Sequence, residues 1–159
     1  MLTFNQKGLL IPETIIHSSL DEFEREFAIK LSEGKRRELF EQYKIYCNEL
    51  KIVCNNKAIV QWIDGSYVTK SKNPSDIDLV FFLDYETAKI KEKDLKQFIY
   101  PQSMASYGID GYIIVIYPDD STYAHNTKAD KAYWMDHFGK TKPNRLRKKI
   151  PKGFLEIII

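Results

Sequence analysis

Two aspartates separated by one apolar residue, Asp76 and Asp78, begin the most strand-like segment of this chain, residues 76–83. β-Branched and aromatic residues dominate the segment, and that composition favours a strand. Because side chains alternate between the faces of a strand, both carboxylates point to one face, about 7 Å apart, while Ile77 and Leu79 point into the opposite layer. Two charges cannot be buried there unpaired, since desolvation is costly for each ion. The segment therefore predicts a strand whose polar face binds cations.

Divalent metal ions would resolve the conflict between the two carboxylates. Mg²⁺ suits such oxygen ligands, and it usually binds through one or two carboxylates plus the phosphates of a substrate. A two-metal site needs a further ligand from an adjacent strand, and Asp110, which opens the expected strand 110–117, is the obvious candidate. Asp119 and Asp120 compete for this role, and a solvated strand edge is the other interpretation of the Asp-x-Asp pair.

A Gly-Ser pair, Gly65-Ser66, precedes Asp76 with nine residues between them. A turn at this position would offer backbone N–H groups to an anion such as a triphosphate. Gly-Ser alone is a weak signal. The joint order is stronger: a strand, the Gly-Ser turn, the Asp-x-Asp strand and then a third strand with an aspartate together indicate phosphoryl or nucleotidyl transfer.

The pattern of elements predicts an α/β or α+β fold, with a mixed sheet, flanking helices and two helices that precede the sheet. Ser19 and Glu22 form a capping-box pattern for the first helix, and Thr127 is the expected N-cap of the last. The expected elements are an extended arm over 4–17, helices over 19–31 and 35–53, a strand over 58–63, a short helix near 67–70, the strand 76–83, a helix over 86–99, the strand 110–117, a helix from Thr127 to Phe138 and a strand over 154–159.

The length of 159 residues favours one domain over 1–159, with an N-terminal arm and helices over 1–56 and a catalytic core over 57–159. Hydrophobic residues make up 43% of the chain and charged residues 29%, an ordinary composition for a soluble globular protein that indicates neither disorder nor a membrane span. The N-terminus lacks the pattern of a signal peptide, so we expect a cytoplasmic location.

Cysteines and histidines do not form a metal-binding pattern in this chain. Cys47 and Cys54 lie seven residues apart on an expected helix, about 10 Å apart along its axis, and that separation is too long for a disulfide. We interpret them as reduced packing residues. His17, His125 and His137 are scattered, and we interpret them as surface or capping groups.

A basic run without any acidic residue covers residues 140–152. A solvated surface or flexible loop is one interpretation. The other is a footprint for nucleotide phosphates, RNA or an acidic partner, although the run lacks the aromatic residues of a single-strand RNA binder. Its seven cations are Lys140, Lys142, Arg145, Arg147, Lys148, Lys149 and Lys152.

The spacing from Gly65-Ser66 to Asp76-Ile77-Asp78-Leu79 resembles the signature of the polymerase β-like nucleotidyltransferase superfamily. A narrower pattern runs from Gly-Ser-Tyr-Val-Thr at 65–69 to Lys-Asn-Pro-Ser-Asp-Ile-Asp at 72–78. Together with the N-terminal stretch and the Lys-Gly-hydrophobic segment from Lys152, this pattern is similar to an uncharacterised bacterial family of nucleotidyltransferase-like proteins. The resemblance extends over nearly the whole chain.

The superfamily resemblance implies a mixed sheet with flanking helices and an Mg²⁺-dependent site in which Mn²⁺ can substitute. Gly65 and Ser66 would contact the β- and γ-phosphates of a nucleoside triphosphate. Asp76 and Asp78 would ligate two metal ions, and Asp110 would be the third carboxylate, which ligates one metal and helps to deprotonate the attacking hydroxyl. The reaction would be attack of that hydroxyl on the α-phosphate, with pyrophosphate leaving.

The chain departs from minimal members of the superfamily just after the Gly-Ser pair. Those proteins commonly have Ala and then Arg where this chain has Val68 and Thr69. The nearest cations here are Lys70 and Lys72, so these two lysines and Thr69 are the candidate nucleotide contacts in place of the arginine. Asp110 is followed by Gly111 rather than a bulky apolar residue.

Three hypotheses follow from these residues. The first is an Mg²⁺-dependent nucleotidyltransferase that moves an NMP, with ATP as the first candidate donor, onto a hydroxyl of a partner protein or RNA. By analogy of fold, such a protein could be an antitoxin that modifies its cognate toxin, or a component of phage defence. The second is an inactive binding module that neutralises or scaffolds a partner protein, and the third is an RNA-associated protein that uses the basic run.

Overall fold

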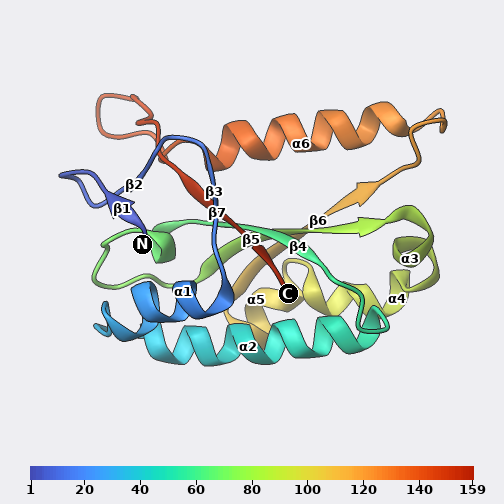
Figure 1. The fold of residues 1–159 in the computed structure, drawn as a ribbon, viewed down its shortest axis with the longest axis horizontal. Helices are drawn as coiled ribbons and strands as arrows, with labels where there is room; N and C mark the ends of the chain where they lie inside the picture. Colours follow the sequence, from blue (N-terminus) through green and yellow to red (C-terminus); the bar gives the residue numbers. More distant parts are fainter.

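A five-stranded mixed sheet forms the centre of the molecule, and helices cover both of its faces (Figure 1). The computed structural model describes residues 1–159. The fold is α+β, as predicted. The strands, in their order across the sheet, are β3 (Ile15–His17), β7 (Phe154–Ile158), β4 (Val60–Asp64), β5 (Ile77–Asp84) and β6 (Ile109–Ile116).

The two strands that flank the central strand β4 each have one antiparallel and one parallel neighbour. β5 runs antiparallel to β4 and parallel to β6, while β7 runs antiparallel to β4 and parallel to β3. A separate antiparallel hairpin is made by β1 (Thr3–Phe4) and β2 (Leu10–Ile11). The chain passes from β4 to β5 through the connection 65–76, which begins with the Gly-Ser pair, and from β5 to β6 through a crossover that contains several short helices.

The helices form two layers of unequal size (Figure 1). One face of the sheet carries the N-terminal helices and the last part of the crossover, and the other face carries one long helix, α6. The helices are α1 (Leu20–Glu24) and the π-helix Arg25–Ile29 that continues it, α2 (Arg36–Val53), the 3₁₀ turn Ser66–Val68, α3 (Tyr85–Ile90), α4 (Glu92–Leu95), the 3₁₀ turn Lys96–Phe98, α5 (Gln102–Tyr107) and α6 (Ala124–Phe138).

The alternation along β5 divides its side chains between two hydrophobic cores. Leu79 and Phe81 belong to the larger core, which is shared with α2, whereas Val80 and Phe82 belong to a smaller core beside α6. Asp78 follows the same alternation, so it lies on the α6 face of the sheet. The smaller core stops at this level, and the polar site begins.

The helix predicted over 35–53 is confirmed as α2, and its apolar residues form a stripe at helical spacing that packs into the larger core. Tyr43, Tyr46 and Leu50 are fully buried in the larger core. Cys47 and Cys54 are both free and buried, as expected for packing residues. None of the helices has the length and apolar character that a membrane crossing demands.

Several predicted boundaries were wrong for local reasons. The arm 4–17 is not a detached extended segment, because it contains the β1–β2 hairpin and strand β3, which joins the sheet before the first helix. The expected helix 86–99 is broken into α3, α4 and a 3₁₀ turn, and α5 was not predicted. α5 ends at Gly108, whose left-handed conformation (φ of +69°) suits a residue without a side chain.

The last helix begins earlier than predicted. α6 starts at Ala124, so Thr127 is inside the helix and is not its N-cap. The Thr127 hydroxyl instead donates to the carbonyl of Val115 and accepts from the N–H of Tyr117. Thr127 therefore ties the helix to the end of β6, while Gly139 follows the last turn as predicted.

Candidate functional site

Three aspartates form a row across three neighbouring strands. The strand register pairs Asp64 of β4 with Asp78 of β5, and pairs Asp78 with Asp110 of β6. Asp64 shares its face with Trp62, Asp78 with Val80, and Asp110 with Ile114, and these apolar residues all belong to the smaller core beside α6. The row therefore lies on one face of the sheet, at the edge of that core.

The turn after β4 is shaped around the middle carboxylate of the row. Gly65 has a φ of +81°, in the left-handed region that disfavours other residues. A Cβ on Gly65 would overlap the carboxylate of Asp78. The Gly-Ser turn thus serves two purposes: it reverses the chain, and it leaves room for Asp78 to lie against the backbone.

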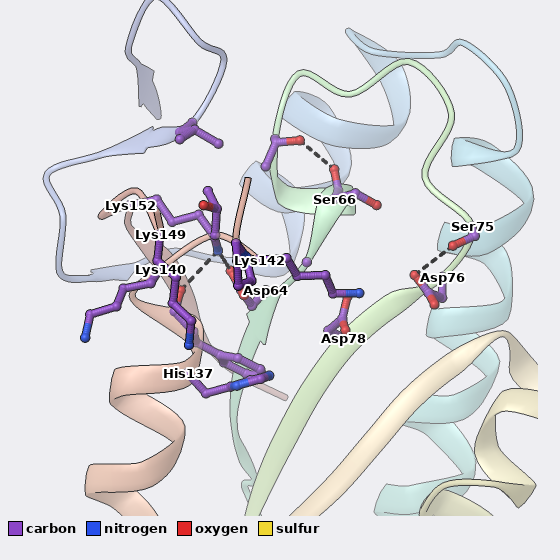
Figure 2. A pocket seen from close by; sticks show the side chains of 16 residues that line it. Asp64, Ser66, Ser75, Asp76, Asp78, His137, Lys140, Lys142, Lys149 and Lys152 are labelled. Carbon is purple, nitrogen blue, oxygen red and sulfur yellow. Dashed lines mark hydrogen bonds and ion pairs between the residues drawn. The ribbon is translucent and has the colours of Figure 1, made fainter. Parts of the chain in front are cut away.

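A cavity of about 370 Å³ opens in front of this turn. One side is formed by the turn and the start of β5, and the other by the end of α6 and the basic segment after it (Figure 2). Four of the lining side chains are lysines, and three are aspartates. The polar and charged lining residues are Asp64, Ser66, Thr69, Ser75, Asp76, Asp78, His137, Lys140, Thr141, Lys142, Lys149 and Lys152.

Two lysines of the basic segment are directed at the carboxylates, and one of them forms an ion pair. Lys152, with only 4% of its surface exposed, forms an ion pair with Asp64 and donates a hydrogen bond to the carbonyl of Phe138 at 3.0 Å. Lys142 extends from its loop toward Asp78 (Figure 2), and its charge opposes the rise in the Asp78 pKa. The two sides of the cavity are thus held together by opposite charges.

The carboxylates have perturbed pKa values. Burial, and then repulsion from Asp76, Asp64 and Asp110, raises the pKa of Asp78 to about 7. Burial also raises the pKa of Asp64 to about 6, although the positive charge of Lys152 opposes that shift. Burial is therefore the main reason for both raised pKa values, and for Asp78 the neighbouring carboxylates add repulsion that a bound cation would relieve.

A second, smaller cavity of about 250 Å³ lies on the other side of Asp78. It shares Asp78, His137 and Phe138 with the first cavity, and its lining also contains Asp110. One carboxylate oxygen of Asp110, Oδ1, is buried without a hydrogen-bond partner. The remaining lining residues are aromatic: Tyr112, Tyr133 and Trp134.

The predicted nucleotide-binding residues divide into two groups. Gly65, Ser66 and Thr69 line the first cavity. Lys70 and Lys72 are not part of its lining. The ammonium group of Lys70 lies 5.1 Å from the ring centre of Phe4, and Lys72 is mostly exposed with its Nζ 4.0 Å from a carboxylate oxygen of Glu33. The turn after Val68 directs both lysines away from the carboxylates.

The three predicted carboxylates Asp76, Asp78 and Asp110 lie around two neighbouring cavities, and Asp78 lines both of them. No group of three or more His, Cys, Asp or Glu side chains in the structure could hold a metal ion as it stands. Asp76 lies two residues before Asp78 and accepts a hydrogen bond from Ser75 at 3.1 Å, whereas Asp110 faces the second cavity. The strand register brings Asp64, not Asp76, into the row with the other two.

Sequence reasoning missed Asp64, His137 and the role of Lys152. Asp64 directly precedes Gly65, but only the register of β4 against β5 shows that it faces Asp78. Lys152 is buried and is therefore not part of an exposed basic surface, whereas the other six cations of the run are exposed. Arg145, Arg147 and Lys148 line neither cavity.

Comparisons with known proteins add a family but no activity. The curated proteins contain no match to this chain, and neither do the solved structures. One family model matches residues 2–158, which is nearly the whole chain and includes every residue of both cavities. The chain therefore belongs to the DUF6932 family, a family of unknown function.

Proposed function

We propose that this protein is an Mg²⁺-dependent nucleotidyltransferase, which moves an NMP from a nucleoside triphosphate to a hydroxyl group in the cytoplasm. ATP is the first candidate for the donor. The observation that carries the proposal is the arrangement of charge around the first cavity. Asp64, Asp76 and Asp78, together with the Gly-Ser turn, face a loop of lysines across a space that is large enough for a ligand.

The lysines support a phosphate ligand. Lys140, Lys142 and Lys149 line the cavity from one side, and they are exposed, so they can move onto an anion. The Ser66 hydroxyl lines the opposite side. A triphosphate between these groups would receive positive charge from the loop and hydrogen bonds from the turn, which is the combination that phosphate sites use.

The carboxylates fit a divalent cation by their donor chemistry. Asp78 carries a pKa raised to about 7 by burial and by three neighbouring carboxylates, and Asp110 has a buried oxygen without a partner. Mg²⁺ needs only one or two protein carboxylates when phosphates and waters supply its remaining ligands. Asp78 and Asp110 would hold the ion, with Asp76 as a further ligand, and the ion would neutralise charge on the transferring phosphate.

The chain's own residues have separate tasks in this proposal. The lysines and the Gly-Ser turn orient the triphosphate so that the bond between the α-phosphorus and the bridging oxygen points away from the incoming hydroxyl. The hydroxyl oxygen forms a new bond to the α-phosphorus, pyrophosphate leaves, and a carboxylate such as Asp110 accepts the hydroxyl proton. The Asp64–Lys152 pair holds the base of the loop in place.

The residues of the two cavities limit the acceptor molecule less than they limit the donor. A hydroxyl of a partner protein, such as a toxin that the protein would inactivate, and the end of an RNA both fit the chemistry. The exposed cations Arg145, Arg147 and Lys148 lie outside both cavities, where they could contact either acceptor. The roles in toxin neutralisation and phage defence rest on analogy alone.

The test is transfer of label from each α-³²P-labelled NTP, in Mg²⁺ or Mn²⁺, to total RNA and to proteins encoded beside this chain. Label is expected with wild-type protein and with the control Asp119→Asn, because Asp119 is exposed and lines neither cavity. Label should be absent with Asp78→Asn. Equal labelling by Asp78→Asn and wild type would overturn the proposal.

The second candidate is a binding module that holds a phosphorylated or anionic partner without chemistry. The absence of a ready three-ligand metal group and the contact of Lys152 with Asp64 favour it. In that case triphosphate binds with equal affinity in the presence and absence of Mg²⁺, and no label is transferred. Binding that requires Mg²⁺ and is lost in Asp78→Asn favours the enzyme.

A further inference from the structure

Aromatic side chains at the end of α6 are left open to solvent. α6 has 15 residues, but only Thr127 and Phe138 are buried. Tyr133 is 61% exposed, although large aromatic residues usually find a place in a core. The packing of the helix on the sheet therefore does not account for the position of Tyr133.

These aromatic groups gather around the second cavity in a regular arrangement. The rings of Tyr133 and His137 are nearly parallel, at 7° and with centres 5.9 Å apart, and the ring of Trp134 stands at 90° to His137. Tyr112, from β6, lies 4.8 Å from Trp134 between ring centres. The cavity thus presents ring faces and ring edges in several orientations, which suits a planar aromatic guest.

The floor of the same cavity is polar. Asp78 and Asp110 line it, and the buried Oδ1 of Asp110 lacks a hydrogen-bond donor. A purely apolar ligand could not pair with Asp78 or Asp110, so a group that binds a carboxylate, such as a hydroxyl or the metal ion proposed above, must accompany the ring. A guest with both an aromatic ring and a hydroxyl group could stack on the aromatic side chains and donate a hydrogen bond to a carboxylate.

The size of the cavity limits the guest. A volume of about 250 Å³ is below the range of most drug-sized ligands, so it holds part of a molecule. The cavity meets the lysine-lined one at Asp78, His137 and Phe138. A molecule with phosphates at one end and a ring at the other could therefore occupy both cavities and pass over Asp78.

We infer that the second cavity is the binding site for a nucleoside, with its base against Tyr133 and Trp134 and a ribose hydroxyl near Asp110. This inference rests on the proposed function, because it assigns the phosphates to the neighbouring cavity. The nucleoside belongs either to the donor triphosphate itself or to a second nucleotide that presents the acceptor hydroxyl. Both sources share the same ring and hydroxyl chemistry.

Calorimetric titration of the full chain in Mg²⁺ tests the inference with three probes: ATP, inorganic triphosphate and adenosine. The variants are Tyr133→Ala, which changes an exposed residue, and Trp134→Leu. The matched control is Met135→Ala, on the same helix, because Met135 is exposed and lines neither cavity. Thermal unfolding of each variant checks that it is folded.

We expect ATP to bind at least tenfold more tightly than inorganic triphosphate, and Tyr133→Ala to remove about tenfold in ATP affinity, as loss of one base-stacking contact does. The affinity for inorganic triphosphate should stay within about twofold of wild type, because the phosphate cavity is intact. Met135→Ala should match wild type with every probe. Adenosine that competes with ATP identifies the donor's own nucleoside, whereas adenosine that still binds at saturating ATP identifies a second one.

The failures of the two proposals are distinguishable. If inorganic triphosphate binds but neither aromatic variant changes the affinity for ATP or adenosine, the nucleoside site is overturned and the proposed function remains. If adenosine binds in a Tyr133-dependent manner but neither ATP nor triphosphate shows any phosphate-dependent binding, the proposed function is overturned and the aromatic site remains. If no probe binds, both are overturned.

Discussion

The absence of a side chain at Gly65 leaves room for the carboxylate of Asp78. A methyl group there would overlap Asp78, and the φ of +81° is unfavourable for any residue that has a Cβ. Two costs are therefore combined at one position: backbone strain and a steric clash. The two can be separated by experiment, because only the clash depends on Asp78.

We expect Gly65→Ala to destabilise the protein by about 2–4 kcal/mol, measured by urea unfolding, through strain and clash together. In an Asp78→Ala background, Gly65→Ala should lower the free energy of unfolding by at least about 1 kcal/mol less than in wild type, because the clashing carboxylate is gone. Equal costs in the two backgrounds would show that the contact with Asp78 contributes nothing.

The raised pKa of Asp78 makes stability depend on pH. The pKa is about 7 in the folded protein and near 3.8 ordinarily, so between about pH 4 and pH 7 the folded state holds a proton that the unfolded chain has lost. Stability therefore falls as pH rises through this window. Asp64 shows a smaller shift in the same direction, to about 6.

The variant Asp78→Asn removes this titration. In EDTA, we expect wild type to lose stability between pH 5 and pH 8, and the variant to lose clearly less. At pH 8 the variant should be more stable by on the order of 2 kcal/mol, since one pKa unit corresponds to about 1.4 kcal/mol. Parallel pH profiles, from urea unfolding of the two proteins, would contradict the assignment.

At the scale of elements, one buried arginine joins α2 to the Gly-Ser turn. The guanidinium of Arg36 is fully buried and has no carboxylate partner. It donates instead to the backbone carbonyls of Tyr67 at 2.7 Å, Thr69 at 2.8 Å and Ser71 at 2.6 Å. These bonds hold the segment that follows Ser66 against the helix, so Arg36 is a positioning residue for one wall of the site.

We expect Arg36→Met to destabilise the protein by about 3 kcal/mol or more, because several buried carbonyls lose their donor. The neighbour Arg37 is exposed, and Arg37→Met should stay within about 0.5 kcal/mol of wild type. Urea unfolding measures both. A similar small effect of the two substitutions would mean that the carbonyls find other partners.

A second link joins the basic loop to β4. Lys152 pairs with Asp64 in a buried position, and it also donates to the carbonyl of Phe138 at the end of α6. Lys152→Met leaves the Asp64 carboxylate buried without its partner, so we expect a loss of about 3–5 kcal/mol in urea unfolding at pH 8. Lys149→Met is the control, because Lys149 is exposed and without an ion pair, and it should be nearly neutral. Equal losses in the two variants would contradict a structural role for the buried pair.

At the scale of the whole molecule, the candidate site joins two segments that are far apart in the chain. The turn and the start of β5 form one side, and the end of α6 with the loop 139–152 forms the other (Figure 2). The closing strand β7 lies next to β4, so it brings the loop to the carboxylates. Each side has charge of one sign, and the two meet only in the folded protein.

The arrangement predicts which cations matter for phosphate. Lys142 lines the first cavity and Arg145 does not, although both are exposed on one loop. Lys142→Ala should weaken inorganic triphosphate binding about tenfold, as loss of a charge-assisted contact does, whereas Arg145→Ala should stay within about twofold. Equal effects of the two substitutions in calorimetric titration would indicate a diffuse electrostatic attraction without a defined site. In that case binding would also be lost at raised salt concentration.

The sequence by itself determined the elements whose patterns are local. The alternation of 76–83 predicts a strand, the apolar stripe predicts α2, and Gly65-Ser66 predicts a turn, because each depends on residues within a few positions of one another. The candidate carboxylates Asp78 and Asp110 could be named in this way as well. Local patterns failed where the crossover between β5 and β6 breaks into short helices, since tertiary packing sets the ends of such helices.

Only the tertiary structure decided which charged groups face one another. Asp64 joins Asp78 because of the register between β4 and β5, and Lys152 reaches Asp64 because β7 lies beside β4. The same folding turned Lys70 and Lys72 away from the cavity and placed His137 in it. Register and strand order arise from contacts between residues distant in sequence, and no pattern along one strand records which strand will become its neighbour.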